Sequence, residues 1–174
     1  MNAFALLFLI AGLGLIGWLS ARARATRFDR GGAKRLHSLP GQHGMYVAMW
    51  TVLPALLFVA LWSAVSPGLV KEAVLAHPAA VQLPQFAFER DALLAEAKRV
   101  ANEDDATAFD QVAGQLAAPT RAAQSHYGWM GTGVAILLAF AGAAFALTRV
   151  RAQFKARSQV ERGMMVLLLV ASLA

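Results

Sequence analysis

The order of apolar and polar positions divides the chain into long uncharged runs separated by charged segments. Three runs contain no Asp, Glu, Lys or Arg and hold 18, 22 and 22 residues, namely 3–20, 45–66 and 127–148. A helix that crosses the hydrocarbon core of a bilayer needs roughly 20 apolar residues. The pattern therefore predicts three complete transmembrane helices.

A fourth apolar run covers residues 163–174 and holds only twelve residues. As a helix it would reach about 18 Å, which is little more than half of the hydrocarbon core. A charged carboxylate at that depth is costly, so we interpret the run as the start of a truncated fourth transmembrane helix. On this interpretation the sequence is a fragment, the front of a larger membrane protein.

The polar segment 67–126 is rich in residues that favour helices and carries apolar stripes at helical spacing. Short helices are expected over 68–76, opened by Ser66-Pro67, over 88–100, and around the stripe Phe109, Val112 and Leu116. These stripes predict a helical hairpin that folds back on itself or on the membrane surface. The fold class predicted is an all-α integral membrane protein with a small helical periplasmic segment.

The charges predict how the spans are oriented. Residues 21–44 carry a net charge of +5 and residues 149–162 one of +4, whereas residues 67–126 carry −3. Short basic loops stay in the cytoplasm under the positive-inside rule, which places the N-terminus and the acidic segment in the periplasm. The predicted segments are 1–66 with two transmembrane helices and the cytoplasmic loop 21–44, the periplasmic segment 67–126, the third transmembrane helix 127–148, the cytoplasmic linker 149–162, and the start of the fourth helix at 163–174.

Composition supports a membrane protein and excludes several kinds of chemistry. Hydrophobic residues make up 58% of the chain and charged residues 15%, against about 25% charged in soluble domains. There is no cysteine, which excludes disulfides, thiol catalysis and cysteine metal sites. The basic residues flank the spans with few aromatic residues among them, so we expect lipid headgroups and not nucleic acid as their partners.

Candidate site residues are few. His37 and His43 lie six apart in a loop with no carboxylate nearby, so loop or interface histidines are the preferred interpretation over a metal pair. One cluster of carboxylates lacks the glycine and the ligand spacing of a calcium loop and is interpreted as a solvated turn between helices. Its members are Glu103, Asp104, Asp105 and Asp110. No catalytic, metal or cofactor site is predicted, and no substrate-binding residue is identified.

The third span is rich in small residues, which allow helices to approach closely in membranes. Gly131-Thr132-Gly133 and Gly142, with nearby alanines 139, 141, 143 and 144, give it a smooth face. We expect this face to pack against another helix. No ionisable residue lies within the three runs, which argues against an ion or proton relay there.

Several short strings resemble the N-terminal region of PstC-type phosphate ABC transporter permeases. They are Ser38-Leu39-Pro40, Gly44 and Tyr46 before the second span, Leu53-Pro54-Ala55 within it, and Val160-Glu161-Arg162 before the last apolar run. The resemblance implies a bacterial inner-membrane importer of phosphate whose permease core follows this region. It also implies three partners: a second permease subunit, an ATPase dimer and a periplasmic phosphate-binding protein.

Two alternatives remain open at this point. Two spans that bracket an external segment of 60 residues are also found in membrane-anchored receptors, so a fragment of a periplasmic sensor is one alternative. A sensor would continue from Arg162 into a soluble signalling helix, whereas an apolar run begins at Gly163. The other alternative is a small structural membrane protein without a transport role.

Overall fold

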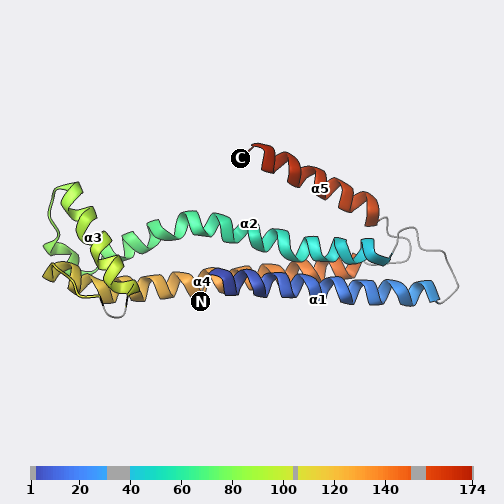
Figure 1. Ribbon diagram of the computed structural model, residues 1–174, viewed down its shortest axis with the longest axis horizontal. Coiled ribbons are helices and arrows are strands. Elements are labelled where there is room, and N and C mark those ends of the chain that lie inside the picture. The colour runs from blue at the N-terminus through green and yellow to red at the C-terminus, as the bar shows by residue number, and fades with distance from the viewer. Residues whose placement is uncertain (1–2, 31–39, 104–105, 150–155, 174) are drawn as a thin grey trace. The chain divides into compact units, whose positions relative to one another are not determined.

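The protein is mainly helical in the residues that the structure describes. The computed structural model describes residues 3–30, 40–103, 106–149 and 156–173, and these contain no strand. The elements are α1 (Ala3–Arg30), α2 (Pro40–Leu75), the 3₁₀ helix η1 (Pro78–Gln82), α3 (Ala87–Asn102), α4 (Gln111–Arg149) and α5 (Ala156–Leu173) (Figure 1). Among the described residues, three helical segments are long and apolar enough to cross a membrane: Phe4–Thr26, Gly41–Leu75 and Gln111–Arg149. The predicted fold class, an all-α membrane protein, is confirmed.

The helices extend beyond the predicted spans, and two expected breaks are wrong. No new helix begins at Ser66-Pro67, because α2 continues to Leu75. Val112 and Leu116 of the predicted stripe belong to α4, which continues through Pro119 into the third span, whereas Phe109 lies before α4 and is exposed. A proline inside a helix removes one backbone hydrogen bond. Packing decides here, since Val74 near the end of α2 and Leu116 near the start of α4 are buried in one cluster.

Other boundaries also differ in part from the prediction. In the sequence, Leu39-Pro40-Gly41 predicts a turn, but the chain is helical from Pro40 onward, which fits the preference of proline for the first helical position. Gly31-Gly32 predicts the end of the first helix, but this pair and Leu39 lie outside the described residues. Helix α3 confirms the helix expected over 88–100. Helix α5 begins at Ala156, inside the predicted linker, because that stretch contains residues that favour helices.

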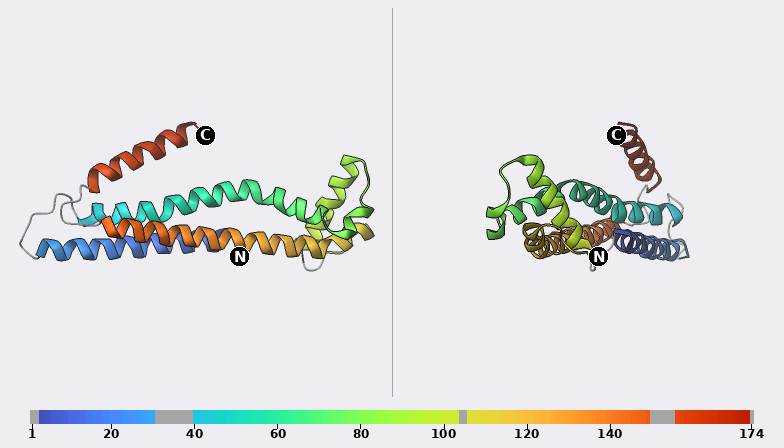
Figure 2. Two further views of the ribbon diagram at one scale, coloured as in Figure 1. Left: turned by 180° about the vertical axis from the view of Figure 1, so that it is seen from behind. Right: turned by 60° about the vertical axis from the view of Figure 1, so that its left-hand side comes forward.

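The described residues form two compact units. The first unit comprises residues up to Val59 together with Gly133 onward, and the second comprises Ala60–Thr132. Helices α2 and α4 contribute to both. In the first unit α1, α2 and α4 lie side by side (Figures 1 and 2), and two buried clusters hold them together. One is centred on Ile10, Ala55, Ala135 and Ala139, and the other on Ala21, Tyr46, Val47 and Ala146.

The second unit packs α3 against the end of α2 and the beginning of α4. Its core consists of Val74, Ala97, Ala113 and Leu116, with Leu93 and Leu94 packed around it. This arrangement matches the expected hairpin that folds back on itself. Side chains satisfy backbone donors at two helix starts: Ala79 N donates to His77 Nδ1 (3.3 Å) at η1, and Val112 N donates to Asp110 Oδ1 (2.7 Å) at α4.

Candidate functional site

The small residues of the first unit mark where its helices touch. A methyl group added at Gly142 of α4 would overlap the backbone carbonyl oxygen of Trp50 in α2. One added at Gly14 of α1 would lie 2.5 Å from a methyl group of Val52 in α2. Ala139 is fully buried in the cluster that joins all three helices. The expected packing face of the third span therefore contacts helices of this same chain.

A second close contact lies within the second unit. The Trp62 indole lies where a side chain at Gly131 would project. Its Nε1 donates a hydrogen bond to the backbone carbonyl oxygen of Tyr127 (3.2 Å). Tyr127 and Gly131 are one helical turn apart on α4, so glycine opens the notch that the indole fills. Of the Gly131-Thr132-Gly133 string, Thr132 is buried, while a methyl group at Gly133 would meet open space.

The predicted histidine pair is described only in part. His43 does not lie in a loop as predicted, because α2 begins at Pro40 and includes it, and its side chain is fully buried in the first unit. His37 lies outside the described residues. Within the described parts of the chain, no group of three or more His, Asp or Glu side chains is placed to hold a metal ion.

The carboxylate cluster consists of residues with local structural roles, as far as it is described. Glu103 Oε2 lies 3.6 Å from Arg99 Nη1 one turn earlier in sequence. Asp110 is the residue that caps α4. Asp104 and Asp105 lie outside the described residues. The two described members therefore agree with the interpretation as a turn between helices.

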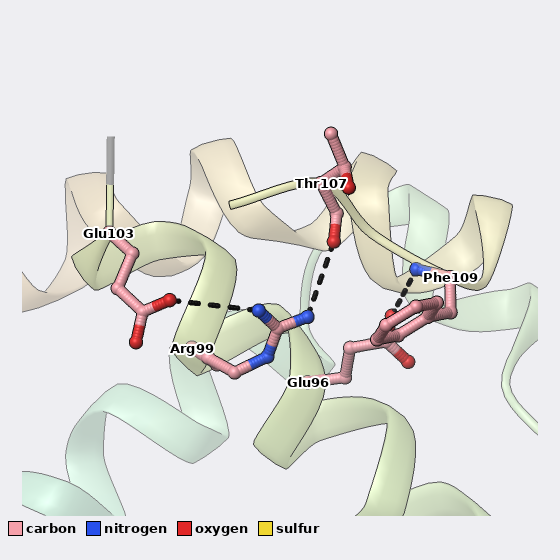
Figure 3. A network of polar contacts seen from close by, with 5 residues as sticks. All are labelled: Glu96, Arg99, Glu103, Thr107 and Phe109. Carbon is pink, nitrogen blue, oxygen red and sulfur yellow. Dashed lines mark hydrogen bonds and ion pairs between the residues drawn. The ribbon is translucent and has the colours of Figure 1, made fainter. Parts of the chain in front are cut away.

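A polar network fastens the connection between α3 and α4, and sequence reasoning missed it (Figure 3). Arg99 Nη2 donates to the carbonyl oxygen of Thr107 (3.2 Å), and its guanidinium lies over the Phe109 ring (5.5 Å to the centroid). Glu96 Oε1 accepts hydrogen bonds from the backbone nitrogens of Phe109 and Asp110. A carboxylate at this position also faces the positive end of the α4 dipole.

An ion pair joins α3 to the end of α2 at the surface of the second unit. Lys71 Nζ lies 2.8 Å from Asp91 Oδ1, and both side chains are about half exposed. The hydrogen bond from Lys71, together with its positive charge, lowers the pKa of Asp91 below its ordinary value. An exposed pair of this kind contributes little to stability.

A pocket of about 540 Å³ opens between the end of α3 and the first half of α4. Its wall is built mainly from alanines, and its polar members are Glu103, Arg121 and Ser125. Arg121 Nε donates to the carbonyl oxygen of Ala101 (2.8 Å), so this guanidinium links α4 to the last turn of α3. The pocket is thus lined largely by small apolar side chains, and its arginine already links the two helices.

The comparisons with known proteins identify a family. No curated protein and no solved structure matches the chain. One family matches residues 6–174, which is nearly the whole sequence, and its description is phosphate ATP-binding cassette transporter. This agrees with the resemblance that the short strings carry. The chain belongs to the phosphate ATP-binding cassette transporter family.

Proposed function

We propose that this chain is a non-catalytic membrane segment of the permease subunit of an ABC importer for inorganic phosphate. The observation that carries the proposal is the family match over residues 6–174, which covers nearly all of the three described helical segments able to cross a membrane. The close helix contacts at Gly14 and Gly142 suit a segment that packs as a scaffold. In this proposal the phosphate path is formed by other parts of the transporter.

The proposed orientation follows from charge. The basic segments 21–44 and 149–162 face the cytoplasm, and the acidic second unit faces the periplasm of a bacterial inner membrane. The partners, by resemblance, are a second permease subunit, an ATPase dimer and a periplasmic phosphate-binding protein. The mixed charges of the second unit, such as the pair of Lys71 and Asp91, suit an aqueous compartment.

The orientation is testable because the chain contains no cysteine. Single cysteines at the exposed positions Gln82 in the second unit and Ser158 in α5 are treated in intact spheroplasts with a membrane-impermeant maleimide. We expect labelling of Gln82→Cys in intact spheroplasts, and labelling of Ser158→Cys only after lysis. The reverse pattern would overturn the proposed orientation but not the family.

The transport role is tested with the assembled importer. Phosphate uptake and co-purification of the ATPase are measured for the transporter with and without residues 1–162. We expect that removal reduces uptake or assembly, because a scaffold segment positions its neighbours. Unchanged uptake together with unchanged assembly would instead favour a membrane protein without a transport role.

A further inference from the structure

One end of the first unit carries two guanidinium groups, each held over an aromatic ring of its own helix. The Arg22 Cζ lies 5.1 Å from the centre of the Trp18 ring on α1. The Arg149 Cζ lies 5.0 Å from the centre of the Phe145 ring on α4. Both distances are within the range of about 6 Å for an attractive cation–π contact. The residues of each pair are four apart, so each helix places its own arginine over its own ring.

The two arginines lie at the same end of the unit. Ala21 and Ala146 are buried in one cluster with Tyr46 and Val47 of α2. Arg22 follows Ala21 directly, and Arg149 lies less than one helical turn beyond Ala146. Each arginine reaches back to the ring four residues earlier on its own helix, so both guanidiniums lie beside this layer of packed side chains.

An apolar surface leads up to this layer. The Phe145 ring packs on Trp50 of α2 with ring centres 5.2 Å apart, and Trp50 in turn packs on Tyr46 at 6.4 Å. Trp50 is 39% exposed and Phe145 is 42% exposed, so the rings also face outward. Aromatic residues of this kind gather where the hydrocarbon core meets the headgroups.

We propose that this end of the first unit binds an anionic phospholipid. Its phosphate is held by Arg149, with Arg22 supplying a second cation, and an acyl chain lies along Trp50 and Phe145. Charge complementarity supports this occupant, since the segments that leave this end carry net charges of +5 and +4. A guanidinium held over a ring presents planar N–H donors that match phosphate oxygens. The acyl surface distinguishes a lipid from free phosphate, and the proposal does not depend on the transport role.

The test measures lipid binding to the purified protein by native mass spectrometry in a neutral detergent. Dissociation constants are determined for phosphatidylglycerol and for phosphatidylcholine. One arginine near an anionic lipid surface contributes about 1 kcal/mol, or a factor of about five. We expect tighter binding of phosphatidylglycerol, and a loss of about fivefold in that preference for Arg149→Gln.

Arg24→Gln is the matched control, because Arg24 is an exposed arginine of α1 in the same basic segment. We expect it to keep most of the preference. Circular dichroism in the same detergent establishes that each variant is folded. If Arg149→Gln does not fold, Phe145→Leu keeps the charge and removes the ring, and it is expected to weaken the preference in part.

Three results would overturn the proposal. Equal affinity for the two lipids would show that no anionic site exists. Equal losses for Arg24→Gln and Arg149→Gln would show diffuse attraction without a site. Displacement of the lipid by millimolar inorganic phosphate would show that the cations bind free phosphate.

Discussion

The contact between Gly142 and Trp50 supports the sharpest prediction about this protein. In Gly142→Ala the added methyl group overlaps a backbone carbonyl oxygen of α2. A backbone atom cannot move aside as the end of a flexible side chain can, so the two helices must separate. Separation loosens the cluster around Ala139 and the one around Ala146, both of which depend on the same pair of helices.

The size of the effect follows from a matched control on the same helix. Gly133→Ala makes the same chemical change where the added methyl group meets open space. Both variants gain the same intrinsic helix preference, about 0.8–1.0 kcal/mol in water, and that gain cancels in the comparison. What remains is the overpacking, typically about 1–3 kcal/mol. This corresponds to a factor of about 5 to 140 in the ratio of folded to unfolded protein.

The assay is reversible unfolding in mixed micelles, with sodium dodecyl sulfate added to a mild detergent and helix content followed by circular dichroism. We expect Gly133→Ala to unfold at or above the wild-type midpoint and Gly142→Ala to unfold below it. Equal midpoints for the two alanine variants would refute the close approach of α2 and α4.

Three further outcomes are expected. Leu116→Ala should lower the free energy of unfolding by about 2–5 kcal/mol in the same assay, because Leu116 is fully buried in the core of the second unit. Glu96→Gln should lower the free energy of unfolding by about 1 kcal/mol, because a charged acceptor at the start of α4 is lost. The control is Glu89→Gln, which removes an exposed carboxylate in the first turn of α3 and should change the free energy of unfolding less. The pKa of Asp91 is lowered in the folded protein, so its small stabilising contribution is present above the ordinary aspartate pKa and is lost as the pH falls through the lowered value. Lys71→Met should therefore reduce the fall of the unfolding midpoint at acid pH, measured in a pH titration. An unchanged fall would contradict the assignment to this ion pair.

The spans could be predicted from the sequence because an uncharged apolar run of about 20 residues matches the thickness of the hydrocarbon core. The C-terminal end of α2 and the N-terminal end of α4 could not be predicted in this way. Ser66-Pro67 indicates the start of a new helix in the local sequence, and the burial of Val74 and Leu116 in one cluster, which stabilises the longer helices, becomes visible only when both are placed. The local sequence pattern favours shorter helices here, whereas tertiary packing stabilises the longer helices that the structure shows.

The sequence indicated that the third span packs against another helix, but not which residues of that helix it contacts. The small residues of the third span indicated a packing face, yet nothing in their spacing pointed to the carbonyl oxygen of Trp50. Glu96 was missed for a related reason. It accepts from backbone nitrogens 13 and 14 residues further along the chain, beyond the reach of any capping pattern that is read within one helix.

The two glycine contacts place different demands on evolution. At Gly131 the neighbour is the side chain of Trp62, so a larger residue at position 131 becomes tolerable once position 62 shrinks, and natural relatives should change these two positions together. At Gly142 the neighbour is main chain, and no exchange of partner side chain removes a carbonyl oxygen. We therefore expect glycine at position 142 in natural relatives whatever residue stands at position 50, and we expect positions 62 and 131 to change together.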